Sequence, residues 1–500
     1  MAGTEELGRG GRLRDDAAGE LVAAAYAAES GHGPRLARGL SLADLAHGVA
    51  LVEGGDLGGE DAKALLRGLL ELYAIPGDEF PWNPSLGDAF NAREAELERR
   101  VGREAAGWLS AGRPRREAFR VALRLTARAG VRELHDAFID QASALARHAR
   151  ETSGALAADY TYLQPAQPTT VGHLLLAYAY PALRDADRAR ASHAALGASV
   201  AGAGGSAGSR WSLDRERLAE LLGSEGLIEH AKDAAWQVDV YLELLANLAI
   251  AATHQSQLGQ DFEIYASQEF GLVELADAHS RASALMPQKK NPYALAAIRT
   301  QAGQAVGDLV GAFVAVHTGS ARTDHFHLLN GSVPRALDEA VAIARLTASV
   351  LELVEVRVDR FEQIARASFV TAADVADVLA LSGGLDYRSA HKVVGRAVRD
   401  LVESGEQPSL LSQQRLAAAA EEAIGRPVEL DEAVLRDALD PAASAAARKQ
   451  TGSSSAAAME RMLDGMETTI AAERAWSETA REQEANAEAA LLARARELAL

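Results

Sequence analysis

The chain has 500 residues, a formal net charge of −19 and no cysteine. This length predicts several domains or one elongated bundle rather than a single small core. The missing cysteine excludes disulfides, thiol nucleophiles and cysteine-ligated metals, and it fits a reducing compartment. The negative charge argues against a nucleic-acid groove, although a local basic pocket could still collect an anionic substrate.

No segment of the sequence has the pattern of a signal peptide or a membrane span. Residues 1–20 lack an apolar stretch. The most apolar segment, residues 240–254, is interrupted by Glu243 and Asn247 and is too short to cross a bilayer. We therefore expect a soluble, cytoplasmic protein without a membrane partner.

Apolar residues recur at helical spacing along most of the chain, and three regions follow from this pattern. Residues 1–112 are predicted to form short helices broken by glycine and proline. Residues 113–365 carry the longest helical patterns, interrupted by a glycine-rich segment at residues 201–209. Residues 366–500 hold shorter helices and end, from about Glu467, in a segment predicted to be a solvated helix or a frayed tail. The long middle helices favour an all-α bundle.

The segment ASALMPQKKNP at residues 282–292 is the most informative local pattern. Two prolines bracket its lysines, which predicts a loop that delivers polar groups rather than a helix. Lys289 and Asn291 could hold a substrate carboxylate. Ser283 could act as a base if backbone N–H groups stabilised its alkoxide. From the residues alone, an ordinary basic turn is the alternative interpretation.

The string MPQKKNP within this segment closely resembles the signature loop of the argininosuccinate lyases, which belong to the fumarase/aspartase superfamily. Other segments are similar to elements of the same family in the same order, at residues 161–188, 204–223, 267–280, 371–398 and 440–452. The resemblance therefore runs from about residue 34 to about residue 465.

This resemblance implies the all-α, three-domain fumarase/aspartase fold, with a central bundle of long helices that forms a 20-helix core in a homotetramer. Each active site would be assembled from three chains. The implied reaction is a reversible anti-elimination, in which a base removes the proton beta to a leaving nitrogen or oxygen and gives fumarate or a close relative. Lys289, Asn291 and helix N-termini would stabilise the doubly charged aci-carboxylate intermediate. No metal or organic cofactor is implied.

The resemblance also assigns candidate site residues. The candidate catalytic residues are Ser283, which matches the base, Lys289 and Tyr162. The candidate substrate-binding residues are Asp88, Asn91, Arg115, Arg116, Thr161, Gln288 and Asn291.

Both members of one charge-relay pair of the family are absent. The histidine that follows Thr161 in the family is Tyr162 here, and the glutamate that partners it is Ala296. Tyr162 keeps a proton and could serve as an acid, but a reference pKa near ~10 matches neutral pH poorly. The double loss suggests that the role of this pair was relinquished or replaced.

The segments that would hold the arginine end of argininosuccinate have also changed. The family's Gly-Arg-Ser-Arg-Asn-Asp reads GRPRRE at residues 112–117, so Arg115 survives and Arg116 replaces an asparagine. Arg116 could receive another carboxylate bidentately or face solvent. Residues 236–239 and 321–324 have lost most of the polar groups of the matching elements. We therefore expect a substrate other than argininosuccinate.

The sequence is compatible with two functions. The leading hypothesis is a lyase that cleaves, or forms in reverse, a C–N bond of a succinyl-type, N-substituted aspartate-like dicarboxylate. The alternative is a repurposed scaffold that is inactive or performs a non-lyase addition or cyclisation, but a dead scaffold has no reason to keep Ser283 with Lys289. His325 and His327 form an H-x-H pair, yet no third ligand cluster accompanies them, so we expect no metal.

Overall fold

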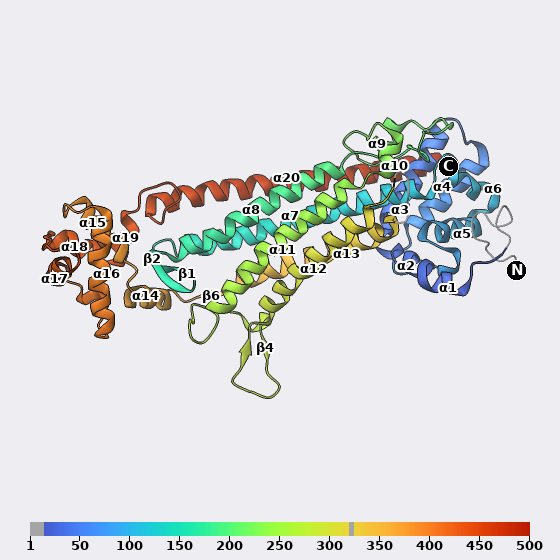
Figure 1. The fold of residues 1–500 in the computed structure, drawn as a ribbon. Coiled ribbons are helices and arrows are strands. Elements are labelled where there is room, and N and C mark those ends of the chain that lie inside the picture. Colours follow the sequence, from blue (N-terminus) through green and yellow to red (C-terminus); the bar gives the residue numbers. More distant parts are fainter. Residues whose placement is uncertain (1–14, 320–324) are drawn as a thin grey trace.

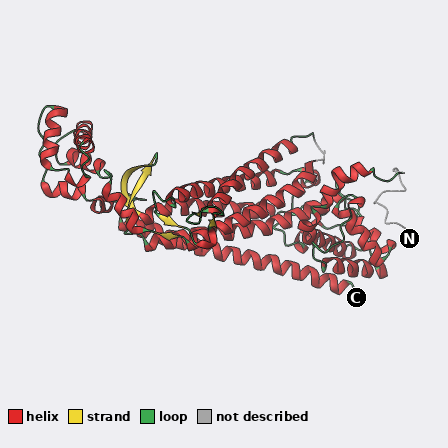
Figure 2. Ribbon diagram, turned by 90° about the horizontal axis from the view of Figure 1, so that it is seen from below, coloured by secondary structure: helices red, strands yellow, loops and turns green. Residues whose placement is uncertain are grey.

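The protein is an elongated and almost entirely helical molecule (Figure 1). A computed structural model describes residues 15–319 and 325–500. The strands described are confined to small two-stranded pairs, which Figure 2 shows in yellow. The prediction of an all-α fold is confirmed. No described helix combines the length and apolarity that a membrane span requires.

Short helices build the N-terminal part of the molecule. They are α1 (Gly19–Leu21), the π-helical turn η1 (Val22–Tyr26), α2 (Ala27–Ser30), α3 (Gly33–Glu53), α4 (Gly59–Tyr73), the 3₁₀ turn η2 (Pro84–Leu86), α5 (Ala89–Val101), α6 (Arg103–Ala106) and the 3₁₀ turn η3 (Gly107–Ser110). On α4, Leu65, Leu69 and Leu72 recur at helical spacing and are fully buried. This apolar face joins α3 and α4 in one core.

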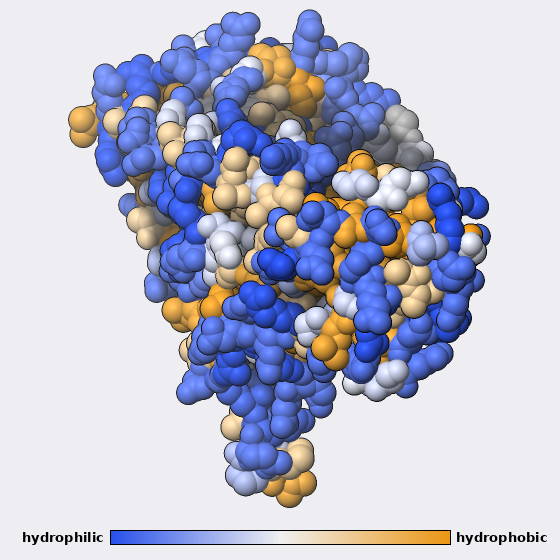
Figure 3. Space-filling model, turned by 90° about the vertical axis from the view of Figure 1, so that its left-hand side faces the viewer, coloured by the Kyte–Doolittle hydropathy of each residue, from blue (hydrophilic) through white to orange (hydrophobic). Residues whose placement is uncertain are grey.

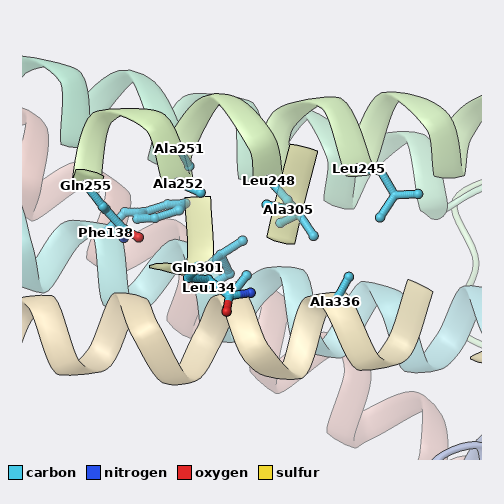
Figure 4. Close-up of a pocket in the computed structure, with 11 residues that line it drawn as sticks. Leu134, Phe138, Leu245, Leu248, Ala251, Ala252, Gln255, Gln301, Ala305 and Ala336 are labelled. Atoms are coloured by element: carbon cyan, nitrogen blue, oxygen red, sulfur yellow. The ribbon is translucent and has the colours of Figure 1, made fainter. Parts of the chain in front are cut away.

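Five long helices form the central bundle. They are α7 (Arg115–Glu151), α8 (Val171–Leu196), α11 (Asp239–Tyr265), α12 (Tyr293–Val316) and α13 (His325–Leu353). Figure 4 shows apolar side chains such as Phe138, Leu248 and Ala305 meeting between α7, α11 and α12. The space that they enclose is about 10 Å³, room for about one water at most. The interior at this point is therefore packed core rather than a substrate site.

The segments between the long helices carry the hairpins and short helices. They are β1 (Leu156–Thr161), β2 (Gln164–Thr170), α9 (Arg215–Leu221), α10 (Ala231–Trp236), β3 (Val273–Glu274), the 3₁₀ turn η4 (Asp277–His279), β4 (Arg281–Ala282), β5 (Lys290–Asn291) and β6 (Glu355–Val356). The pairs β1–β2, β4–β5 and β3–β6 are antiparallel.

The C-terminal module lies at the opposite end of the bundle from the N-terminal helices (Figure 1). It consists of α14 (Val358–Ala367), α15 (Ala372–Leu381), α16 (Tyr387–Glu403), the 3₁₀ turn η5 (Pro408–Leu410), α17 (Gln413–Ile424), α18 (Glu432–Leu439) and α19 (Pro441–Ala447). A separate apolar cluster forms its core. The division into domains at residues 112 and 365 stays a prediction.

Three arginines spaced four residues apart on α7 bind the carbonyl ends of other helices. Arg120 donates to the carbonyl of Trp236 at the end of α10 (2.9 Å). Arg124 donates to the last carbonyls of α8, at 3.2 and 3.4 Å. Arg128 donates to the carbonyl of Gly223 just beyond α9 (2.7 Å). Because the last carbonyls of a helix lack partners within it, these guanidinium groups complete three helix ends.

A buried carboxylate of α7 fixes the glycine-rich segment that follows α8. The two carboxylate oxygens of Glu117 accept the backbone N–H groups of Gly202 and Gly204, each at 2.7 Å. Both glycines have φ near +70°, a conformation that glycine adopts without strain. The glycine-rich segment that interrupts the helical pattern is therefore held to the bundle by this carboxylate.

The last helix, α20 (Ala456–Leu498), runs back from the C-terminal module along the bundle to the N-terminal helices (Figures 1 and 2). Its Glu473 accepts from Arg190 (2.9 Å) and lies 3.0 Å from His135 Nε2. Leu491 is buried in the core of the N-terminal part. The segment from about Glu467 is therefore a helix, one of the two forms expected for it, and not a frayed tail, because one of its faces is buried.

We predict that Leu491→Ala lowers the free energy of unfolding by about 2–5 kcal/mol, because it leaves a cavity where α20 packs on the N-terminal core. The control is Leu500→Ala, since Leu500 is 91% exposed. Urea unfolding followed by circular dichroism measures both variants. Equal stability of the two would contradict the packing of α20 described here.

Candidate functional site

Ser283 lies at the start of a loop that projects from the side of the bundle. Arg281 pairs with Asn291, and Ala282 with Lys290, so the loop closes a short hairpin. In the end-on view of Figure 3 this projection is mostly hydrophilic, with apolar atoms at its tip. Leu285, in the loop, is 85% exposed. The hairpin therefore presents its tip to solvent in the single chain.

Backbone N–H groups of the loop converge on the Ser283 hydroxyl. Its Oγ accepts from the N–H of Leu285 (3.3 Å) and of Met286 (3.0 Å). Donors in this arrangement favour negative charge on the oxygen that they surround. The geometric condition for Ser283 as a base is thus present, whereas its catalytic role stays a prediction.

The other candidate residues of the loop differ in their contacts. The side chain of Asn291 donates to the carbonyl of Arg281 (2.8 Å) and so holds the hairpin. Lys290 pairs with Glu274 and Asp277 at 3.1 and 2.8 Å. Gln288 and Lys289 are exposed. Among the described contacts, Lys289 has no ion-pair partner, which leaves it as the lysine of the loop best suited to a substrate carboxylate.

Tyr162 occupies the tip of the second hairpin, β1–β2. Thr161 pairs with Gln164, so Tyr162 and Leu163 form a two-residue turn. Both residues have left-handed backbones, with φ of 53° and 59°. This conformation suits such turns but is costly for residues other than glycine, asparagine and aspartate. The Tyr162 side chain is 99% exposed. Because strained backbones cluster at functional sites, Tyr162 stays a candidate site residue.

The third group of candidates lies where α5 and α7 begin. Asp88 is buried and caps α5 through the N–H of Asn91 (3.1 Å), and its other oxygen accepts from Arg115 (3.2 Å). The Asn91 amide donates to the carbonyl of Leu86 (2.7 Å). The Arg115 side chain is 55% exposed. Arg116 is half-buried, and burial lowers its pKa. Arg115 is therefore the member of this group most open to a ligand.

One chain does not bring the three groups together. Arg115 begins α7, and the hairpin with Tyr162 follows the end of this 37-residue helix. A helix of that length spans about 55 Å at ~1.5 Å per residue. The loop with Ser283 projects from a third place (Figure 1). A single site that contains all three groups would need more than one copy of the chain.

The sequence also raised a possible metal site and a substrate-binding element at residues 321–324. Among the described residues, no group of three or more histidine, aspartate or glutamate side chains is arranged to hold a metal ion. Residues 321–324, which match a substrate-binding element of the family, lie outside the described residues. The side chains of His325 and His327 are likewise not described.

Glu94 was not among the candidates from the sequence. It carries a buried carboxyl group beside the third group of candidate residues. Its Oε1 accepts the Ser110 hydroxyl, whereas its Oε2 is buried without a partner among the described residues. Burial raises the pKa of Glu94 to about 7. The sequence gives no signal for this, because a glutamate on an amphipathic helix normally faces solvent.

Comparison with known proteins agrees with this architecture. The family described as Lyase matches residues 43–307, and that described as Argininosuccinate lyase C-terminal matches residues 369–446. The argininosuccinate lyase of Halobacterium salinarum (strain ATCC 29341) is 34% identical over 86% of this chain and 87% of its own length. That of Methanocaldococcus jannaschii is 30% identical over 80% and 81%.

Solved structures share the fold over nearly the whole chain. The crystal structure of EDDS lyase in complex with formate aligns with a TM-score of 0.86 and 26% identity, covering 97% of this chain and 96% of that one. The class II fumarase of Schistosoma mansoni aligns with a TM-score of 0.68 at 14% identity, which shows the fold alone. Fold and sequence together place this chain in the fumarase/aspartase superfamily of lyases, among its argininosuccinate lyase-like members.

We predict that Glu94→Gln changes how stability depends on pH. In the wild type, the unfolded chain loses this proton near its ordinary pKa of 4.5, whereas the folded chain keeps it to about 7. The contribution of Glu94 to the free energy of unfolding therefore falls by roughly 2–3 kcal/mol as pH rises from 4.5 to 7. Glu94→Gln removes this fall, and urea unfolding at pH 5 and pH 8 measures it. The exposed Glu98→Gln is the control, and an unchanged pH dependence in Glu94→Gln would contradict the assignment.

Proposed function

We propose that this chain is a carbon–nitrogen lyase that eliminates an amine from an N-substituted aspartate-type dicarboxylate and gives fumarate or a close relative. Membership of the superfamily supports elimination as the reaction class. The observation that carries the proposal is the Ser283 hydroxyl, which accepts two backbone N–H groups in the loop that also presents Lys289. The structural neighbour EDDS lyase and the argininosuccinate lyases among the sequence relatives are themselves lyases.

In the proposed mechanism, the Ser283 alkoxide removes the proton from the carbon beta to the leaving nitrogen. The electron pair of the C–H bond moves into the adjacent carboxylate and gives a doubly charged aci-carboxylate. Lys289 stabilises this added charge at the substrate carboxylate. The electrons then return to form the C=C bond while the C–N bond breaks, and the nitrogen leaves with its pair. Thr161, Gln288, Asn291 and Arg115 are proposed to hold the substrate.

The substrate is proposed not to be argininosuccinate. Position 296, where the family has a glutamate, is an exposed alanine on α12, so position 162 has no charged partner there. The leaving nitrogen therefore either takes its proton from Tyr162 or departs without one. A weakly basic amine can leave in either way, whereas a strongly basic one needs a proton donor.

The assembly is proposed to be a homotetramer with shared active sites. The three groups of candidate residues lie at separate places on one chain, so neighbouring copies would have to complete each site. On α12, Val306, Val310, Phe313 and Val314 form an apolar face with exposed fractions of 46, 56, 53 and 73%. Apolar faces of this kind mark interfaces. In the proposed homotetramer, the α12 helices of four copies would meet in the core and bury this apolar face.

We predict that Ser283→Ala lowers kcat by roughly 10³-fold or more, because it removes the base from the proton-transfer step. The assay supplies fumarate with a panel of amines of graded basicity and follows the ultraviolet absorbance of fumarate. The control is Ser280→Ala, whose hydroxyl donates to the carbonyl of Ala276 just before the hairpin (3.0 Å). Circular dichroism checks that both variants fold.

A wild type that consumes fumarate, beside an inactive Ser283→Ala and an active Ser280→Ala, supports the lyase. No consumption with any amine contradicts it and favours the repurposed scaffold. Activity restricted to strongly basic amines contradicts a leaving group that departs unprotonated. In that case Tyr162→Phe should lower the rate most for the most basic amines if Tyr162 is the acid.

We predict that two variants impaired in different parts of the site restore each other. Ser283→Ala and Arg115→Ala are expected to be inactive or nearly so when each is expressed alone. In a mixed assembly, some sites take Ser283 from the Arg115→Ala chain and Arg115 from the Ser283→Ala chain, so these sites contain neither defect. Coexpression should therefore recover a fraction of the wild-type activity. Light scattering should give four chain masses. Active monomers, or mixtures as inactive as their parents, would contradict shared sites.

A further inference from the structure

A large cavity lies away from all the candidate catalytic residues, between α3, α7, α13 and α20. Its volume is about 650 Å³, within the range of about 300–1,000 Å³ typical of small-molecule sites. On its α7 side, here called its floor, the cavity is lined by the small residues Thr126, Ala129 and Gly130. Leucines of three different segments line it: Leu42, Leu222 and Leu491. The cavity is therefore roomy and partly apolar.

Ion pairs between different helices line the edge of this cavity. Arg35 on α3 pairs with Asp338 on α13 (2.8 Å), and Arg38 on α3 pairs with Glu488 on α20 (2.6 Å). The exposed fractions of the Arg35 and Arg38 side chains are 48% and 73%. These pairs join helices from the two ends of the sequence at one opening.

A further pair joins α13 to α7 at the same cavity, between Arg345 and Glu133 at 2.9 Å. The side chain of Arg345 is 61% exposed. The three pairs described here thus connect α3, α7, α13 and α20 around the cavity. The exposed arginines lie where a ligand would enter.

Two buried arginines lie deeper in the cavity, and each of them pairs with a glutamate. Arg132 contacts Glu484 of α20 at 3.1 Å, and its side chain is 11% exposed. Arg128 has a 7% exposed side chain and binds Glu225 (2.5 Å). Each of the six arginines of the lining pairs with a carboxylate, so the cavity offers guanidinium N–H donors rather than unpaired positive charge.

Several of these guanidinium groups use only part of their hydrogen-bonding capacity within the chain. Arg35 reaches Asp338 through Nε, and Arg345 reaches Glu133 through one terminal nitrogen. A guanidinium has five N–H donors, which suits bidentate binding of a further carboxylate. The N–H donors that remain and the apolar lining therefore converge on one class of ligand.

We propose that this cavity binds a small organic anion with an apolar body, such as an aryl carboxylate, at a site separate from the proposed lyase site. The carboxylate lies near the arginines, and the apolar body lies against the small residues of α7 and the leucines. Because α20 forms one wall, binding stabilises the contact between α20 and the rest of the chain. The ligand therefore raises the unfolding temperature.

Calorimetric titration of the full chain with 1-naphthoate tests this proposal. One saturable site per chain is expected, with a higher unfolding temperature in its presence. Ala129→Phe fills the cavity floor and should weaken binding at least tenfold, about 1.4 kcal/mol. Ala418→Phe on the exposed face of α17 is the matched control and should bind as the wild type does. Neutral 1-naphthalenemethanol should bind at least tenfold more weakly than 1-naphthoate.

A second variant keeps the test decisive if Ala129→Phe fails to fold. The double variant Arg35→Gln with Arg345→Gln leaves the floor intact and should weaken 1-naphthoate binding at least threefold. No saturable binding by the wild type, as when another copy of the chain covers the cavity, overturns the proposal. Equal binding by the variants, or by the neutral alcohol, overturns it too. Ser283→Ala should bind 1-naphthoate normally, so failure of the lyase proposal would be seen separately.

Discussion

The arginines of α7 are the interaction on which the arrangement of the other helices depends. Arg120, Arg124 and Arg128 each donate to the carbonyl end of a different helix, so α10, α8 and α9 all end against one face of α7. One turn further, Arg132 contacts Glu484 of α20. A buried guanidinium needs acceptors on all sides, and unpaired helix carbonyls supply them without a second buried charge. These hydrogen bonds therefore fix three helix ends against α7.

The same helix separates the residues that chemistry would have to unite. Arg115 stands at one end of α7, and the turn with Tyr162 follows the other end. A rigid spacer of this length cannot fold back on itself, so in the proposed homotetramer a complete site would form between copies of the chain. The apolar face of α12 is the surface available for this. The rigidity of one chain and the proposed completion of the site between chains would thus both follow from one long helix.

The sequence predicted the fold well because long helices and the MPQKKNP loop leave clear patterns, and the all-α fold and family are confirmed. It predicted that backbone N–H groups would have to surround Ser283 but could not locate them. For the end of the chain it allowed a helix or a frayed tail, and it did not indicate that the helix α20 buries one face against the bundle. It also missed Glu94, because burial of a lone glutamate depends on tertiary packing that no local pattern records.

The turn at Tyr162 and Leu163 has a consequence for how such proteins diversify. Its direction is set by two left-handed backbones and by the pairing of Thr161 with Gln164, not by the side chain that it carries. A residue substituted at position 162 is therefore aimed the same way as the one that it replaces, provided that it tolerates the backbone. The hairpin therefore orients whichever side chain occupies position 162 in the same way. If the proposed lyase uses position 162 at the leaving group, one substitution there would change that contact while the loop with Ser283 stays as it is.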